Sequence, residues 1–231
     1  MKLILSGGGI GEKSSLAYSL FAKELNGGKV LLIPLANEEK KYQDDYAWFV
    51  NEVKPFGISN ICMVTSPEDI TKELLESVQG IYVEGGNTFL LLYLLKSCNA
   101  FAVIQDFLNT DKVIMGGSAG ALIFGKSIET ALTDDLNIIA SDDNIVGLKD
   151  MTGFNVLNGY SFFVHYRVKE RQYAATEEKV QRLLKANHNL ICLPEEDSVI
   201  VENGKITLLG NLPAEVIRKD YRKTITNGET I

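Results

Sequence analysis

Short apolar runs alternate along this chain with longer stretches in which apolar residues recur every three or four positions. The short runs are typical of buried strands, and the longer stretches are typical of amphipathic helices. This pattern predicts strands at 3–5, 30–33, 61–64, 80–83, 113–115, 190–193 and 198–209, with a strand-like run before position 165. It predicts helices at 14–26, 43–56 and 176–186, and others that open near 66, 89 and 100. Residues 126–160 show no clear pattern.

Glycine, proline and capping residues mark where several of these elements begin and end. Gly27 and Gly28 end the first helix, and Pro34 stops the second strand. The helix near position 66 opens with Ser66 as its N-cap and a proline at its first position. Asn203-Gly204 is a strong hairpin signal within 198–209.

Repeated strand–helix units predict an α/β fold, in which helices cover both faces of a mainly parallel sheet to give a three-layer sandwich. The chain has 231 residues and no linker, low-complexity tract or internal repeat, so we expect one domain over residues 1–231. Glycine clusters at 7–9, 85–86 and 116–117 each follow a predicted strand. Because ligand sites lie at the carboxyl ends of parallel strands, these clusters are expected to converge on one edge.

The chemistry is most visible in residues 115–121, which read Met-Gly-Gly-Ser-Ala-Gly-Ala directly after an apolar run. This is the G-x-S-x-G pattern of a nucleophile elbow, in which a serine projects from a tight strand-to-helix turn. Small neighbours keep the strained turn uncrowded, and the free N–H groups of the following helix face developing negative charge. Ser118 is therefore a candidate nucleophile. The alternative is a glycine-rich loop that only closes a strand.

Residues 85–88, Gly-Gly-Asn-Thr, lie between a predicted strand and an apolar helix. Small residues let backbone N–H groups approach a reacting carbonyl, so Gly86 and Ala119 are candidate oxyanion-hole donors. Asn87 or Thr88 can cap the helix at the same time, and this structural role is compatible with a catalytic Gly86.

A serine nucleophile needs a general base, and the chain has only two histidines. His165 follows the apolar run 162–164, where the end of a strand can present it at the site. His188 comes just after a helix, where a histidine usually caps the helix or faces water. An acid must orient the base. Two acidic pairs are candidates, and the pattern does not choose between them: Glu195 with Glu196, and Asp134 with Asp135.

Residues 6–14, Ser-Gly-Gly-Gly-Ile-Gly-Glu-Lys-Ser, invite comparison with nucleotide-binding loops. Glu12 stands where both G-x-x-x-x-G-K-[ST] and G-x-G-x-x-G require glycine, and its carboxylate would repel phosphate. We therefore expect a tight strand-to-helix loop near the site.

Charge and cysteine usage exclude several other classes. The net charge of −7 argues against nucleic acid and anionic membranes as default partners. The three cysteines have no C-x-x-C spacing, so a zinc site is not expected, and their apolar surroundings suggest reduced thiols. The apolar runs at the N-terminus and at 89–95 are too short for a signal peptide or a membrane span. These features predict a soluble cytoplasmic protein, monomeric or homodimeric.

Five blocks, in this order, resemble the S51 serine peptidases, the aspartyl dipeptidase (peptidase E) family with the cyanophycinases as relatives. They are Leu31-Leu32-Ile33-Pro34, Glu84-Gly85-Gly86-Asn87-Thr88-Phe89-Leu90-Leu91, Gly117-Ser118-Ala119-Gly120-Ala121, Val164-His165-Tyr166 and Leu193-Pro194-Glu195. The resemblance covers roughly residues 1–210. It implies a fold like that of the class I glutamine amidotransferases (flavodoxin-like), with serine in place of their cysteine at the elbow.

The resemblance also implies the residue roles: Ser118 as nucleophile, His165 as base, Glu195 as orienting acid, and Gly86 and Ala119 as the oxyanion hole. The expected activity is hydrolysis of dipeptides or short peptides, without a metal or organic cofactor. Family members specific for an N-terminal aspartate carry an arginine near the start of the helix after the histidine. Residues 174–178 here, Ala-Ala-Thr-Glu-Glu, contain none, although Arg167 and Arg171 are close in sequence.

Two alternatives stay open. One is a cyanophycinase-like hydrolase of isopeptide or amide bonds. The other is a non-catalytic ligand-binding protein on the same fold, which would bind its ligand without turnover.

Overall fold

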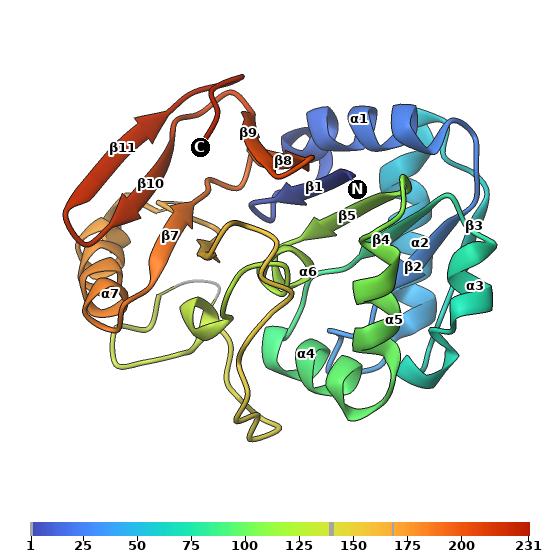
Figure 1. The fold of residues 1–231 in the computed structure, drawn as a ribbon, viewed down its shortest axis with the longest axis horizontal. Helices are drawn as coiled ribbons and strands as arrows, with labels where there is room; N and C mark the ends of the chain where they lie inside the picture. Colours follow the sequence, from blue (N-terminus) through green and yellow to red (C-terminus); the bar gives the residue numbers. More distant parts are fainter. Residues whose placement is uncertain (1, 139–140, 168) are drawn as a thin grey trace.

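The computed structural model describes residues 2–138, 141–167 and 169–231, which form two β-sheets with helices packed against them (Figure 1). The main sheet has the strand order β3-β2-β4-β5-β1-β8-β9. Its first five strands are parallel, and β8 and β9 add an antiparallel hairpin at one edge. In chain order the strands are β1 (Lys2–Ser6), β2 (Val30–Ile33), β3 (Ile61–Met63), β4 (Gly80–Val83), β5 (Val113–Gly117), β8 (Ser198–Glu202) and β9 (Lys205–Leu209).

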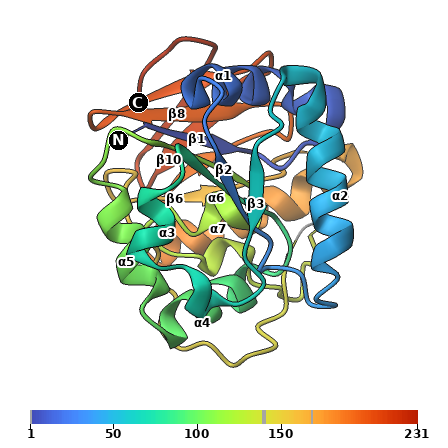
Figure 2. The same cartoon turned by 90° about the vertical axis from the view of Figure 1, so that its right-hand side faces the viewer.

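Helices cover both faces of the main sheet (Figure 2). Val30 and Leu32 of β2 pack with α1 (Ser15–Leu25) and α2 (Tyr42–Val53), whereas the alternate residues Leu31 and Ile33 face the other cluster. That second cluster includes buried residues of α3 (Lys72–Glu76), α4 (Thr88–Ser97), α5 (Ala100–Phe107) and α6 (Ala119–Leu122). Apolar residues at every position of β2 therefore reflect a strand buried on both sides.

A smaller sheet lies beside the main one, with the order β11-β10-β7-β6. Its strands are β6 (Tyr160–Phe163), β7 (Asn189–Cys192), β10 (Ala214–Arg218) and β11 (Tyr221–Ile225). The helix α7 (Tyr173–Lys185) covers it through Val180 and Leu183, while Ile191 and Val216 join the core cluster that extends into the main sheet. Five short 3₁₀ turns complete the described elements: Gly11–Ser14, Lys54–Phe56, Pro67–Asp69, Glu129–Ala131 and Glu170–Gln172.

The structure confirms the α/β class, the mostly parallel main sheet and the positions of the expected strands, and it changes some details. The first helix ends at Leu25, and the left-handed residue after it is Asn26, with a φ of 47°, rather than the expected glycine. Ser66 caps no helix: a 3₁₀ turn follows it, and α3 begins later with Thr71 as its N-cap. The sheet formed by β6, β7, β10 and β11 was not predicted, and it separates the expected strand 190–193 from the hairpin 198–209.

Among the residues that the structure describes, no single helix has the length and apolar composition needed to cross a membrane. Within the described residues, only α4 and α5 taken together have that length and composition, and the chain bends by 96° between them. The buried Leu91, Leu92 and Leu95 of α4 belong to the core.

Candidate active site

The carboxyl ends of three adjacent parallel strands, β4, β5 and β1, bring the expected glycine clusters together. Ser6 at the end of β1 lies opposite Gly117 at the end of β5. A Cβ added to Gly85 after β4 would lie 3.2 Å from Cβ of Ser118. The expected convergence on one edge of the sheet is confirmed.

Ser118 occupies the strained turn that the elbow pattern predicts. It has a φ of 50° and a ψ of −115°, a conformation that L-residues rarely adopt. The flanking glycines permit close backbone packing. A Cβ on Gly116 would lie 2.3 Å from the carbonyl oxygen of Gly120, and one on Gly120 would lie 2.1 Å from that of Val83. Bulkier residues would push the turn away from β4.

A chain of hydrogen bonds joins the three residues that the resemblance singled out. The hydroxyl of Ser118 lies 2.9 Å from Nε2 of His165, and Nδ1 of His165 lies 2.8 Å from Oε1 of Glu195. With Nδ1–H donating to the carboxylate, Nε2 is free to accept the serine proton. These contacts have the geometry that a nucleophile, a base and an orienting acid require.

The glycine-rich loop after β1 holds Glu195 in place, a contact that the sequence did not reveal. Lys13 donates to Oε2 of Glu195 at 2.8 Å, and the Gly9 amide donates to the Glu195 carbonyl at 2.9 Å. Burial raises the pKa of Glu195, but the hydrogen bonds from Lys13 and His165 outweigh it, so the net pKa lies below its ordinary value. The carboxylate therefore stays ionised at neutral pH.

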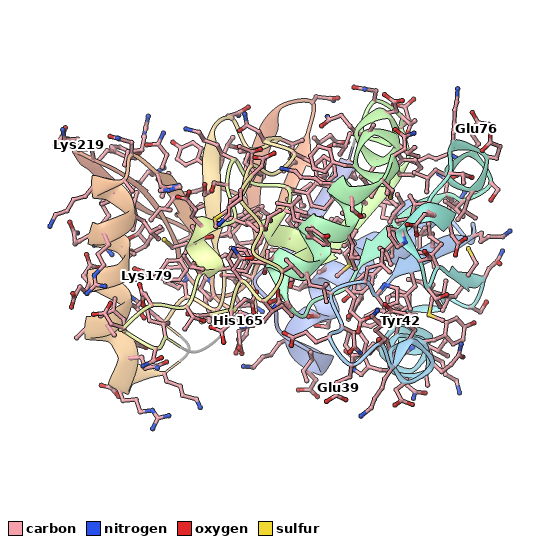
Figure 3. The ribbon with its side chains drawn as sticks, turned by 90° about the horizontal axis from the view of Figure 1, so that it is seen from below. Glu39, Tyr42, Glu76, His165, Lys179 and Lys219 are labelled. Carbon is pink, nitrogen blue, oxygen red and sulfur yellow. The ribbon has the colours of Figure 1, made fainter. Side chains whose placement is uncertain are left out.

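The same loop positions the base. The His165 amide donates to the carbonyl of Gly7 at 3.1 Å, and a Cβ on Gly8 would lie 2.4 Å from Cε1 of the His165 ring. Gly8 has a φ of 102°, which a side chain would strain. His165 itself has a φ of 52° and follows β6 of the smaller sheet. Figure 3 shows it between Lys179 on one side and Glu39 and Tyr42 on the other.

The two expected oxyanion-hole residues lie beside Ser118: Ala119 follows it in the chain, and Gly86 lines the same cavity. Ala119 is the first residue of α6, and Gly86 follows Gly85, which is in contact distance of Ser118. Gly86 has a φ of 134°, and a Cβ there would meet the carbonyl oxygen of Ala36 at 2.5 Å. Asn87 caps α4 by accepting from two backbone amides, as the structural alternative for this turn predicted. That cap leaves Gly86 free for another role.

The other sequence candidates lie elsewhere. Asp134 pairs with Lys179, and Asp135 pairs with Arg182, both on α7. Glu196 lies 3.9 Å from Lys13. His188 does not face water as expected: it is 8% exposed and contacts Glu129 and Ser161 through its two ring nitrogens. Its backbone amide donates to the carbonyl of Leu183 at 3.0 Å and so caps the end of α7, as the alternative expectation for this position predicted.

Two cavities meet at Gly85 and Ser118. The larger, of about 590 Å³, extends from Gly86 towards the loop after β2 and the start of α2. The smaller, of about 200 Å³, extends past the loop after β1 to Trp48, Tyr82 and Glu84. A nucleophile at the junction can attack a substrate bond when the groups on the two sides of that bond lie in different cavities.

Neither arginine near His165 in sequence lines these cavities. Arg167 is exposed, pairs with Glu215 at 3.2 Å and lies over the ring of Tyr166 in a separate hollow. Arg171 is exposed in a 3₁₀ turn. The acidic residues of the larger cavity were not predicted, because they come from parts of the chain that are as far apart as positions 38 and 142.

Comparison with known proteins agrees with the geometry. The model of peptidase family S51 matches residues 3–209. Peptidase E of Shewanella baltica (strain OS195) is 30% identical over 224 residues, which cover 92% of this chain and 87% of that protein. Peptidase E of Escherichia coli O1:K1 / APEC is 27% identical over 220 residues, covering 90% and 89%.

Two solved structures share the fold. A peptidase from an acI-B1 actinobacterium superposes with a TM-score of 0.74 at 17% identity, over 100% of this chain and 96% of that one. A Listeria monocytogenes EGD-e protein, solved as a candidate peptidase E, gives a TM-score of 0.64 at 22% identity, over 97% of each chain.

An elbow serine at the carboxyl edge of a mostly parallel sheet, hydrogen-bonded to a histidine, defines the class of the serine hydrolases. Within that class, the chain belongs to peptidase family S51 and is a serine peptidase. The family suggested by the five sequence blocks is confirmed.

Proposed function

We propose that this chain hydrolyses dipeptides or other short peptides, with Ser118 as nucleophile, His165 as base and Glu195 as orienting acid. The observation that carries the proposal is the unbroken hydrogen-bond chain from Ser118 through His165 to Glu195. Its relatives are named peptidase E, which supports a small peptide as substrate.

In this mechanism His165 takes the proton of Ser118 as the serine oxygen attacks the substrate carbonyl. The amides of Gly86 and Ala119 hold the oxyanion. In the described part of the chain, neither amide donates another hydrogen bond. His165 then protonates the leaving amine, and water hydrolyses the acyl-enzyme by the same route in reverse. Glu195, kept ionised by Lys13, stabilises the imidazolium form of the histidine.

We further infer a three-layer architecture like that of the class I glutamine amidotransferases, supported by helices on both faces of the main sheet and by an elbow after β5. The three cysteines are free, which supports a cytoplasmic location, where thiols stay reduced. We also propose that the protein acts as a monomer or a homodimer. Light scattering of the purified chain distinguishes the two states.

A serine-reactive phosphonate tests the nucleophile. We expect one adduct by intact mass, located on Ser118 by peptide mapping and absent from Ser118→Ala. Its rate of formation should fall sharply in His165→Ala, since the hydroxyl then lacks a base. An unmodified Ser118 at every concentration tried would contradict the mechanism.

A library of dipeptides and isopeptides tests the reaction. Turnover of dipeptides by the wild type, lost in Ser118→Ala, is the expected result. Turnover confined to isopeptide bonds would indicate a cyanophycinase-like hydrolase instead. Binding that is equal in wild type and Ser118→Ala, with no turnover by either, would indicate a non-catalytic protein.

A further inference from the structure

The larger cavity beside Ser118 is acidic. Four carboxyl side chains line it, Glu38, Glu39, Asp45 and Asp142, and none of its described lining residues is a lysine or arginine. Glu39 is neutralised by an ion pair with Lys41. The charges of the other three carboxylates are not balanced in this way.

Neutral donors hold these three carboxylates. The side-chain amide of Asn37 donates to both oxygens of Asp45, at 2.8 and 2.7 Å. The Asn87 amide donates to Glu38 at 2.8 Å. Within the described residues, none of the three carboxylates forms an ion pair.

Asp142 is held by both the amide and the hydroxyl of Thr88, so it too is fixed without a balancing cation. It lies close enough to His165 for the histidine charge to lower its pKa, although burial is the larger effect and raises that pKa. Burial also raises the pKa of Asp45. The cavity thus holds fixed negative charge that is partly removed from water and lacks a counter-charge.

The adjoining cavity adds a further acid at the junction. Glu84 lines it, and its Oε2 is buried without a hydrogen-bond partner in the part of the chain that the structure describes. Burial raises the pKa of Glu84 to about 8, so this carboxyl is mostly protonated at neutral pH and adds no negative charge to the larger cavity.

We propose that the larger cavity binds a positively charged group of the substrate, an ammonium or guanidinium, next to the bond that Ser118 attacks. This deepens the proposed function and rests on it. Fixed carboxylates repel an acidic side chain in the same place, so the cavity disfavours aspartyl peptides. The described His, Cys, Asp and Glu side chains include no group of three or more arranged to hold a metal ion, which favours an organic cation as the occupant.

Peptides that differ only in charge test this proposal. The first series consists of dipeptides in which arginine, or its neutral analogue citrulline, stands before or after an alanine. Aspartyl dipeptides form the acidic series, and an N-acetylated version of each peptide is included. We expect kcat/KM for the arginine peptide to exceed that for the citrulline peptide by about tenfold or more. If the free α-amine is the bound cation, the arginine and citrulline peptides are turned over alike, and N-acetylation lowers kcat/KM for both.

Isosteric variants locate the effect. Asp45→Asn and Glu38→Gln are expected to lower kcat/KM for the preferred cationic peptide by about tenfold each and to leave the neutral peptide within about twofold. Asp44→Asn is the matched control, because Asp44 precedes Asp45 on α2 but lines a different hollow with Lys40 and Lys41. Asp44→Asn should leave kcat/KM unchanged for both the cationic and the neutral peptide.

The outcomes separate the two proposals. Equal turnover of charged, neutral and N-acetylated peptides, all lost in Ser118→Ala, would overturn the cation site and leave the peptidase mechanism standing. A preference for aspartyl peptides would also overturn it. No turnover of any peptide by the wild type would overturn both.

Discussion

Replacing Glu84 by glutamine is expected to stabilise the protein at neutral and alkaline pH but not in acid. The carboxyl follows β4, and its Oε2 is buried without a partner among the described residues. Burial, with a smaller contribution from the charge of Asp45, raises the pKa of Glu84 to about 8. In the unfolded chain the carboxyl returns to its ordinary pKa of 4.5.

The direction follows from proton binding. The folded protein holds the Glu84 proton more tightly than the unfolded chain does, so folding is penalised once the unfolded carboxyl ionises. The free energy of unfolding therefore falls as pH rises from about 4.5 towards about 8, and the penalty is complete above that. The difference between these two pKa values, at about 1.36 kcal/mol for each unit, sets an upper limit of about 5 kcal/mol.

Urea unfolding followed by circular dichroism from pH 4 to pH 9 measures this effect. Glu84→Gln should match the wild type near pH 4 and exceed it by up to the limit given above near pH 9. Glu12→Gln, which changes an exposed glutamate, serves as the control and should track the wild type throughout. A Glu84→Gln difference that is the same at pH 4 and pH 9 would refute the argument.

Three further variants test the surroundings of the two histidines. Gly8→Ala places a methyl group against the His165 ring at a φ of 102°, so kcat should fall about 100-fold in steady-state assays while circular dichroism still shows a folded protein. Lys13→Gln removes a hydrogen bond that lowers the pKa of Glu195, so kcat/KM should fall about tenfold and the acidic limb of its pH profile should move to higher pH. An unmoved limb would contradict that role. His188→Asn disrupts a buried polar contact away from Ser118 and should cost about 1–3 kcal/mol in urea unfolding with kcat unchanged.

The main sheet and the strained turn at Ser118 were predictable because their signals are local. Fully buried parallel strands require unbroken apolar runs, and Val30–Ile33 and Gly80–Val83 have the bounds that the pattern predicts. The elbow needs glycines next to Ser118 for reasons of backbone packing alone. With only two histidines in the chain, the position of His165 after a strand was enough to favour it as the base.

The rest depends on contacts between distant parts of the chain. Lys13 and Glu195 are 182 positions apart, and no pattern near either residue indicates that they meet. The strand β11 was missed because most of it is exposed and it lacks the apolar run of a buried strand. The strand β10 was missed because Glu215 interrupts its short set of apolar residues. The acidic residues of the larger cavity were missed for the same reason as the lysine: they come from the loop after β2, from α2 and from the segment around Asp142, which only the fold brings together.

The hydrogen bond between Ser118 and His165 joins two sheets, because the serine follows β5 of the main sheet and the histidine follows β6 of the smaller one. Its length of 2.9 Å therefore depends on the position of one sheet relative to the other. A small slip between them would lengthen this bond while each sheet kept its own hydrogen bonds. Catalytic activity is therefore more sensitive than the strand content to a change in the packing of one sheet against the other. On heating, activity should decline before the strands unfold.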